Sequence, residues 1–155
     1  EEYAAFYDLE QQFINSKGWL DSGIYKKAEE LGRGDLVKFT EYVPDEMLCP
    51  LMCGALAFVF PSIYEGFGMP PLEAMACGVP VLTTHAASLP EVVGEDAVVT
   101  DPYSPEDIAA GLERLYTDEA LRQRLKAAGP KRAAQFTWER SAEQLYAVYQ
   151  EACRE

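Results

Sequence analysis

Residues 55–78 read A-L-A-F-V-F-P-S-I-Y-E-G-F-G-M-P-P-L-E-A-M-A-C-G: an apolar run, a turn with two glycines and the start of a helix. The run Ala55–Phe60 is continuously apolar, as in a parallel strand that is covered on both faces. Pro71–Cys77 is predicted to be helical and to stop at Gly78. A strand that leads through a short turn into a helix is the repeating step of an α/β fold. This stretch therefore decides the fold class.

The same alternation of strand and helix continues on both sides of this stretch. Further strands are predicted at Gln11–Asn15, Leu36–Thr40, Val79–Thr83 and Ala97–Thr100. Further helices are predicted at residues 1–9, Asp21–Leu31, Pro44–Met52, Pro105–Tyr116, Asp118–Gln135 and Thr137–Cys153. Short turns between strand and helix favour parallel pairing, so we expect an α/β fold with a Rossmann-like parallel sheet flanked by helices. In such sheets a ligand binds at the carboxyl ends of the strands.

The turn after the apolar run has the features of an anion site. Gly66 and Gly68 allow a sharp turn and let a ligand approach the main chain closely. Pro70–Pro71 suits a helix entry, where a missing N–H costs nothing. We expect the free N–H groups of the first helical turn, near Leu72 and Glu73, to point back at the loop and, with the helix dipole, to attract an anion.

Two carboxylates flank this turn, Glu65 before the loop and Glu73 in the predicted first turn of the helix. A carboxylate repels phosphate, but it accepts paired hydrogen bonds from vicinal hydroxyls, as acidic residues do from ribose in dinucleotide folds. Hydroxyl acceptors beside phosphate donors together indicate a nucleotide-sugar. The alternative is a purely structural turn, because glycine-rich turns are common in α/β proteins and a first-turn Glu is favoured by the dipole anyway.

Composition narrows the class of partner. The formal net charge of −13 argues against a nucleic-acid binder, which needs clustered Lys and Arg. Four cysteines without a C-x-x-C pair and a single His predict no metal site, and we expect reduced, buried thiols in a cytoplasmic protein. No apolar run approaches the ~18–20 residues that span a bilayer.

The segment E-G-F-G-M-P-P-L-E, Glu65–Glu73, resembles the signature of the family 4 retaining glycosyltransferases. The resemblance covers residues 13–150. It extends over F-V-F-P-S before the segment, E-A-M-A-C-G-V-P-V and S-L-P-E-V-V-G-E-D-A after it, and V-x-D-P at Val99–Pro102. K-G-W-L at Lys17–Leu20, V-K-F-T-E-Y-V-P at Val37–Pro44 and Q-F-T-W-E at residues 135–139 also match.

This resemblance implies the C-terminal, donor-binding half of a GT-B fold, and a reaction that transfers a hexosyl group, mannosyl or glucosyl, with retention. The donor would be UDP- or GDP-linked, and no metal is implied. Glu65 is implied to be catalytic, near the hexose hydroxyls or the reacting centre, and Glu73 to hold the ribose diol. The other implied donor-binding residues are Gly66, Phe67, Gly68, Met69 and Leu72 in the loop and helix start, and Tyr42 and Val43 beside the base.

The chain also departs from the family pattern. Glu41 stands where the family usually has Gly, and nothing before Gln11 matches the strand that carries a diphosphate-clamping Arg and Lys. We therefore expect residues 1–155 to form one domain that is incomplete at its N-terminus. The acceptor, a glycan or lipid, would bind a missing N-terminal domain, and the isolated chain would be inactive.

The last helix of a GT-B enzyme packs across the other domain. Its apolar residues here, Trp138, Leu145, Tyr146 and Tyr149, are thus expected to be exposed and to favour a homo-oligomer. The parent protein would be cytoplasmic or peripheral at the inner membrane face. Two alternatives stay open: a glycogen-synthase-like or sucrose-synthase-like transferase, and a non-catalytic nucleotide-binding or self-associating fragment.

Overall fold

A computed structural model describes residues 12–14, 26–27, 29–32, 34–40 and 43–153 of the chain. The chain divides into two compact units, residues 1–56 and residues 57–155. The predicted helix at residues 1–9 lies outside the described residues.

The first unit contains a pair of short parallel strands. Strand β1, Gln12–Ile14, pairs with β2, Lys38–Thr40, so the two predicted strands are confirmed with tighter bounds. Helix α3, Asp45–Gly54, follows β2 and extends two residues beyond the predicted end. The described part of the predicted helix before β2 is helical, and Gly32 ends it with a φ of +64°.

The second unit is built on a three-stranded parallel sheet in the order β3-β4-β5. These strands are Phe58–Phe60, Val81–Thr84 and Val98–Thr100. In their register, Phe58 lies opposite Val81, and Leu82 lies opposite Val98. The predicted α/β fold with parallel pairing is confirmed.

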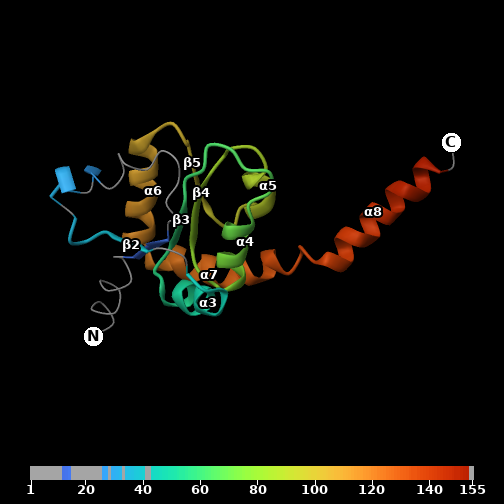
Figure 1. The fold of residues 1–155 in the computed structure, drawn as a ribbon, viewed down its shortest axis with the longest axis horizontal. Helices are drawn as coiled ribbons and strands as arrows, with labels where there is room; N and C mark the ends of the chain where they lie inside the picture. Colours follow the sequence, from blue (N-terminus) through green and yellow to red (C-terminus); the bar gives the residue numbers. More distant parts are fainter. Residues whose placement is uncertain (1–11, 15–25, 28, 33, 41–42, 154–155) are drawn as a thin grey trace. The chain divides into compact units, whose positions relative to one another are not determined.

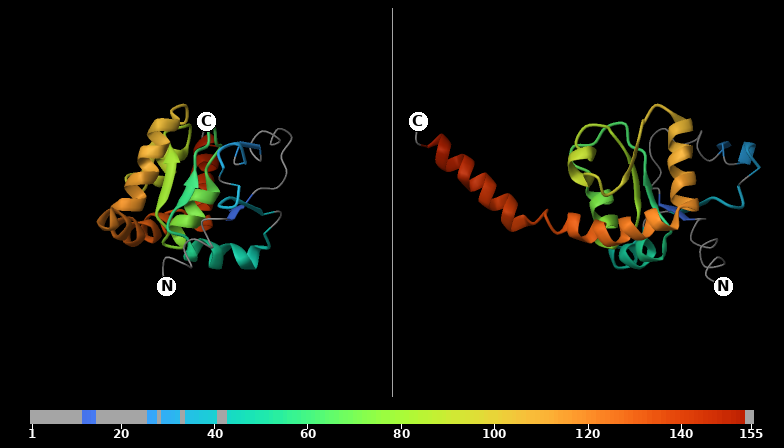
Figure 2. Two further views of the ribbon diagram at one scale, coloured as in Figure 1. Left: turned by 90° about the vertical axis from the view of Figure 1, so that its left-hand side faces the viewer. Right: turned by 180° about the vertical axis from the view of Figure 1, so that it is seen from behind.

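Five helices accompany this sheet within the described part of the second unit. They are α4, Met69–Ala76; α5, Leu89–Val93; α6, Pro105–Thr117; α7, Glu119–Ala133; and α8, Trp138–Ala152. Helix α6 covers one face of the sheet and α4 and α5 lie on the other, as Figures 1 and 2 show from different sides. Helix α7 packs against both α4 and α6.

The last three helices begin where the sequence supplies a capping side chain. The side chains of Ser104, Asp118 and Thr137 accept hydrogen bonds from backbone N–H groups three residues further on. Such caps satisfy one of the N–H groups that a helix start leaves without an intrahelical partner. Because these capping residues are recognisable in the sequence, the predicted starts of α6, α7 and α8 are correct within one residue.

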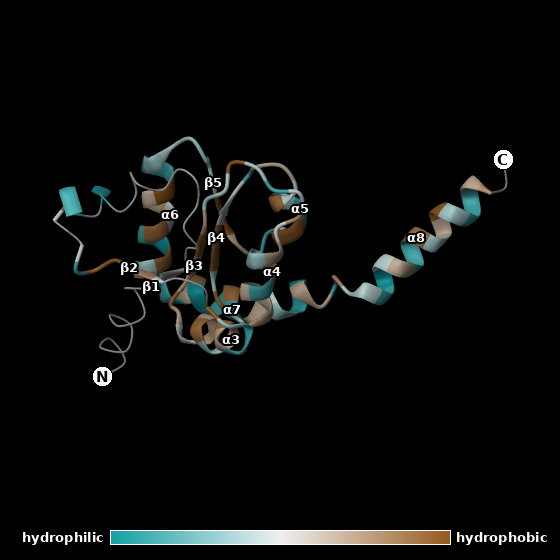
Figure 3. Ribbon diagram, viewed as in Figure 1, coloured by the Kyte–Doolittle hydropathy of each residue, from teal (hydrophilic) through white to brown (hydrophobic). Residues whose placement is uncertain are grey.

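The core of the second unit lies between β4, β5 and the helices α6 and α7. Leu82, Val98, Leu115 and Leu125 form its buried cluster. Figure 3 shows apolar residues concentrated on the three strands, whereas α8 alternates apolar and polar residues. Every residue of β4 is buried, which fits its place between two neighbouring strands.

Several expectations about burial were wrong. Strand β3 is half-buried instead of covered on both faces, because within this unit it pairs only with β4. Helix α5 was not predicted at all. Cys49, Cys53 and Cys153 are exposed, and Cys77 is intermediate. The expectation for the last helix is confirmed, since its residues Tyr146 and Tyr149 are exposed.

Gly111 provides a test of the packing of α6 on the sheet. A Cβ atom there would lie 2.7 Å from Leu82 Cδ1 and 2.9 Å from Thr100 Cγ2. Gly→Ala inside a helix ordinarily stabilises by roughly 1 kcal/mol, but overpacking costs about 1–3 kcal/mol. We expect Gly111→Ala to lower the free energy of unfolding, measured by urea denaturation and circular dichroism. Ala110→Gly, at an exposed position of the same helix, is the control for helix propensity and should cost about 1 kcal/mol. A more stable Gly111→Ala variant would contradict this packing.

Candidate functional site

The candidate site is the connection between β3 and α4, at the carboxyl end of the parallel sheet. It begins at Pro61, and α4 begins at Met69. One continuous segment thus carries Glu65, Gly66, Phe67, Gly68, Met69, Leu72 and Glu73. Its position at this edge matches the place where open α/β sheets bind ligands.

Gly68 makes the turn from the loop into the helix. It is the N-cap of α4, it has a φ of +105°, and no side chain caps the helix end. A Cβ at Gly68 would lie 2.8 Å from Cδ2 of the buried Leu89. Both the left-handed backbone and the close approach therefore require glycine at this position.

Main-chain N–H groups of the loop are the donors that can face a ligand. Helix α4 starts with Met69 and then has Pro70–Pro71, which lack an N–H. The N–H of Leu72 donates to the carbonyl of Gly68 at 3.4 Å. The N–H groups near Leu72 and Glu73 were the predicted anion donors. The N–H groups of residues 66–69, next to the positive end of the helix dipole, are the better candidates.

The two glutamates differ in their surroundings. Glu65 is half-buried, and the hydroxyl of Ser62 donates to its Oε1 at 3.0 Å. Glu73 is exposed and is the fifth residue of α4. The prediction that Glu73 lies in the first helical turn was wrong, because the helix begins at Met69, two residues earlier than predicted. The helix dipole therefore does not explain a glutamate at position 73, because the dipole effect falls off within the first turn.

Hydroxyl groups from the end of β4 and from the residue before α5 hold this loop. Thr84 Oγ1 donates to the carbonyl of Ser62 at 2.6 Å. Ser88 Oγ lies 3.0 Å from the carbonyl oxygen of Glu65 and 2.9 Å from that of Phe67. The sequence did not predict a role for Ser62, Thr84 or Ser88 at the site. The position of Ser62, three residues before Glu65, is a signal that could have identified it. Ser88 gives no such signal, because a serine before Leu-Pro-Glu cannot be distinguished in sequence from an ordinary helix cap.

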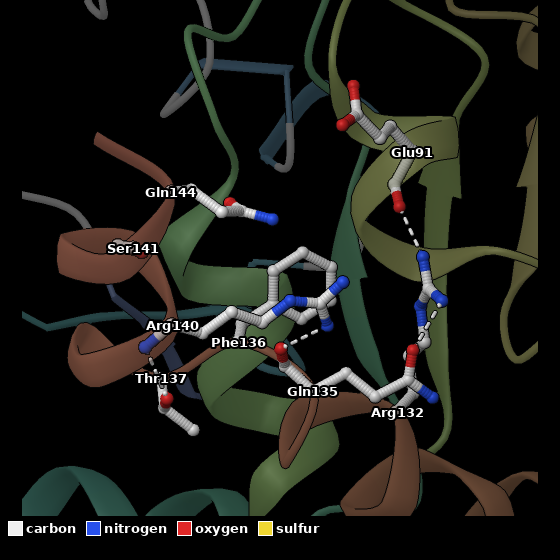
Figure 4. A pocket seen from close by; sticks show the side chains of 8 residues that line it. All are labelled: Glu91, Arg132, Gln135, Phe136, Thr137, Arg140, Ser141 and Gln144. Carbon is white, nitrogen blue, oxygen red and sulfur yellow. Dashed lines mark hydrogen bonds between the residues drawn. The ribbon is translucent and has the colours of Figure 1, made fainter. Parts of the chain in front are cut away.

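An open polar pocket borders the loop where α7 gives way to α8 (Figure 4). Its lining residues are Glu91, Arg132, Gln135, Phe136, Thr137, Arg140, Ser141 and Gln144. Arg132 donates to the carbonyl of Glu91 and to Gln135 Oε1, and its guanidinium carbon lies 5.2 Å from the centre of the Phe136 ring. The Phe136 ring meets the ring of Phe67 edge-on, with 5.8 Å between centroids. Phe67 thus joins the loop to the α7–α8 junction.

The residues implied to lie beside a nucleobase belong to the first unit. Val43 is half-buried and immediately precedes Pro44 and α3. Tyr42 lies outside the described residues. Their role stays a prediction.

A family model described as "Glycosyl transferases group 1" matches residues 18–132. O-antigen chain mannosyltransferase B of Escherichia coli is 41% identical over 133 residues, which are 86% of this chain and 35% of that protein. A D-inositol 3-phosphate glycosyltransferase of Corynebacterium jeikeium is 39% identical over 126 residues, which are 80% of this chain and 30% of that protein. The chain therefore spans about a third of the length of these curated relatives.

Solved structures show the same fold. Sucrose-phosphate synthase from Thermosynechococcus elongatus is similar with a TM-score of 0.80 and 26% identity, over 99% of this chain and 42% of that chain. The C-terminal domain of a group 1 family glycosyl transferase (LpcC) from Francisella tularensis has a TM-score of 0.65 and 28% identity, over 76% of this chain and 64% of that chain. Among the described helices, none combines the length and apolarity that crossing a membrane requires.

The turn at Gly68 provides a test of the loop geometry. Gly68→Ala places a side chain in the left-handed region, which costs about 1–2 kcal/mol, and pushes it against Leu89. We expect a lower free energy of unfolding in urea denaturation. Gly66→Ala is the matched control, because a Cβ there meets no atom within 4 Å and Gly66 has no positive φ. Its effect should stay within about 0.5 kcal/mol. Equal losses in the two variants would contradict the special role of Gly68.

Proposed function

The chain belongs to the family of group 1 glycosyl transferases, and we propose that it is the donor-binding domain of a family 4 retaining enzyme. Its fold, like that of the solved structures it resembles, is the predicted GT-B α/β fold. The proposed reaction transfers a hexosyl group from a nucleotide-sugar to an acceptor glycan or lipid. The observation that carries the proposal is the segment from the β3–α4 loop into α4, which combines main-chain donors, a helix N-terminus and two carboxylates.

The diphosphate of the donor is proposed to lie against the amides of residues 66–69. Gly68, with its left-handed backbone, turns the chain so that α4 starts directly behind this loop. The N-terminal end of α4 carries a partial positive charge, and a helix N-terminus is suited to an anion. As the glycosidic bond breaks, negative charge grows on the leaving diphosphate, and donors already in place stabilise it without reorganisation. Because these donors supply the stabilisation, we propose that the reaction uses no metal ion.

The two carboxylates are proposed to divide the sugar hydroxyls of the donor between them. Glu73 is exposed one helical turn beyond Met69, which suits a carboxylate that accepts hydrogen bonds from the ribose diol. Glu65 is half-buried and hydrogen-bonded through Oε1 to Ser62. Its second carboxylate oxygen, Oε2, is then the proposed acceptor for hexose hydroxyls near the reacting centre.

The sugar and the base are proposed at the level of a class. Mannosyl transfer has support from the E. coli relative, whose name is that of a mannosyltransferase. Glucosyl transfer remains the alternative, in line with the likeness to a sucrose-phosphate synthase. A UDP- or GDP-linked donor is proposed. For the whole protein we propose a cytoplasmic enzyme, peripheral at the inner membrane face, whose acceptor binds outside the residues of this chain.

Nucleotide titration of the chain tests the assignment. We expect UDP or GDP to bind with a Kd that is roughly millimolar, and to shift NMR amide signals of residues 66–76. Glu73→Gln should remove most of this response, since hydrogen bonds to charged groups contribute about 1.5–3 kcal/mol. Shifts confined to residues far from this loop would reject the donor site.

Glu65→Gln is the matched variant, with the same loss of charge in the same segment. Because Glu65 is assigned to the hexose, the affinity for UDP or GDP should stay close to that of the unmodified chain. The additional affinity for the corresponding nucleotide-sugar should be lost. The reverse pattern in the two variants would exchange the roles of Glu65 and Glu73.

A second proposal is self-association through α8, which the exposure of its apolar residues favours. None of its residues is buried, and Trp138 is 83% exposed. Trp138, Leu145 and Tyr149 recur at the helical spacing that places side chains on one face. A contiguous apolar face of this kind commonly marks an interaction surface.

Light scattering coupled to size-exclusion chromatography measures this association. We expect the unmodified chain to form dimers or larger species and Leu145→Glu to be monomeric, because a charge would be buried in the contact. Gln150→Glu adds the same charge at another exposed position of α8 and should leave the association unchanged. A chain that is monomeric at every concentration would refute the proposal.

A further inference from the structure

Ser88 lies directly before α5, where a serine ordinarily caps the helix with its hydroxyl. In this structure it does not: no side chain caps α5. The Ser88 hydroxyl instead lies against a segment more than twenty residues earlier in the chain. The Ser88 hydroxyl therefore does not cap α5 and is hydrogen-bonded to the β3–α4 loop instead.

The contacts of Ser88 span the glycine of the loop. Its Oγ lies 3.0 Å from the carbonyl oxygen of Glu65 and 2.9 Å from that of Phe67, on either side of Gly66. A hydroxyl has one proton to donate, so the two carbonyls share it. Gly66, as a glycine, has more accessible backbone conformations than Glu65 or Phe67. One side chain thus restrains two peptide groups of the loop, Glu65–Gly66 and Phe67–Gly68.

Residues at both ends of the β4–α5 connection support the same segment. Leu89 packs against Gly68, and Thr84 donates to the carbonyl of Ser62. Between them, Ala87 has a φ of +48°, a conformation that a residue other than glycine keeps only where its surroundings impose it. The turn that presents Ser88 is therefore itself held in a defined shape, and the loop lies against it.

We infer that Ser88 is a positioning residue of the donor site: its hydroxyl sets the direction of the residue 65–68 main chain, and with it the ligand-facing amides and the Glu65 carboxylate. This inference rests on the proposed function, because it concerns the same loop. Holding the loop before the donor arrives removes the ordering cost that binding would otherwise carry. The same restraint keeps the donors aimed at the leaving diphosphate, where electrostatic stabilisation depends on preorganisation.

The test compares Ser88→Ala, Ser88→Thr and Ser104→Ala in the chain, labelled with ¹⁵N. Ser88→Thr keeps the hydroxyl, and Ser104→Ala removes a serine hydroxyl whose hydrogen bonds are with residues of α6. In Ser88→Ala without ligand, we expect the amide signals of residues 66–69 to shift and broaden. The Kd for UDP or GDP should rise about fivefold, the effect of losing a typical hydrogen bond. Ser88→Thr should restore both readouts, and Ser104→Ala should change neither although it lowers the melting temperature.

The outcomes separate this inference from the proposed function. If the loop signals and the nucleotide affinity of Ser88→Ala match those of Ser104→Ala, the positioning role is rejected. If the unmodified chain shows no loop response to UDP or GDP, the proposed function fails. In that case the ligand-free loop signals still decide on Ser88: perturbation in Ser88→Ala with rescue in Ser88→Thr supports the restraint, and unchanged signals overturn it.

Discussion

The second unit depends on strand β4, which is buried along its whole length and pairs with a parallel strand on each side. Its last two residues, Thr83 and Thr84, are buried polar side chains in an apolar layer. Burying a hydroxyl is unfavourable unless it is hydrogen-bonded. Both hydroxyls donate to main-chain carbonyls of β3 and the loop that follows it, Thr83 to Phe60 and Thr84 to Ser62. The end of β3 and the start of the candidate loop are thereby tied to the centre of the sheet.

From this anchor the loop is held by its neighbours and not by secondary structure of its own. Gly68 can approach Leu89 because it has no side chain, and Ser88 then reaches the carbonyls on both sides of Gly66. The segment with the proposed chemistry and the segment that shapes it are thus different parts of the chain. A substitution in the β4–α5 connection can therefore alter the site without touching a ligand.

The two helices around the candidate site have opposite relations to the fold. Helix α4 is buried on its inner side, with Leu72 and Met75 in the interior, so its N-terminal end has a defined direction. Helix α8 has no buried residue and keeps its apolar side chains in solvent. Its connection to α7 is nevertheless ordered through Phe136, which contacts both Phe67 and Arg132. The packing of the unit thus reaches the residues just before α8 and leaves the apolar face of α8 exposed.

The sequence by itself determined the α/β class, the parallel strands, the capped helices and the family, because hydrophobic period, caps and short motifs act over a few residues. It also identified the loop with Glu65, Gly68 and Glu73. Only the tertiary structure decided that α4 begins at Met69, that β3 is half-buried and that α5 exists. The role of Ser88 belongs to this second group, since its partners lie more than twenty residues away and no local pattern encodes a contact between two connections of a folded sheet.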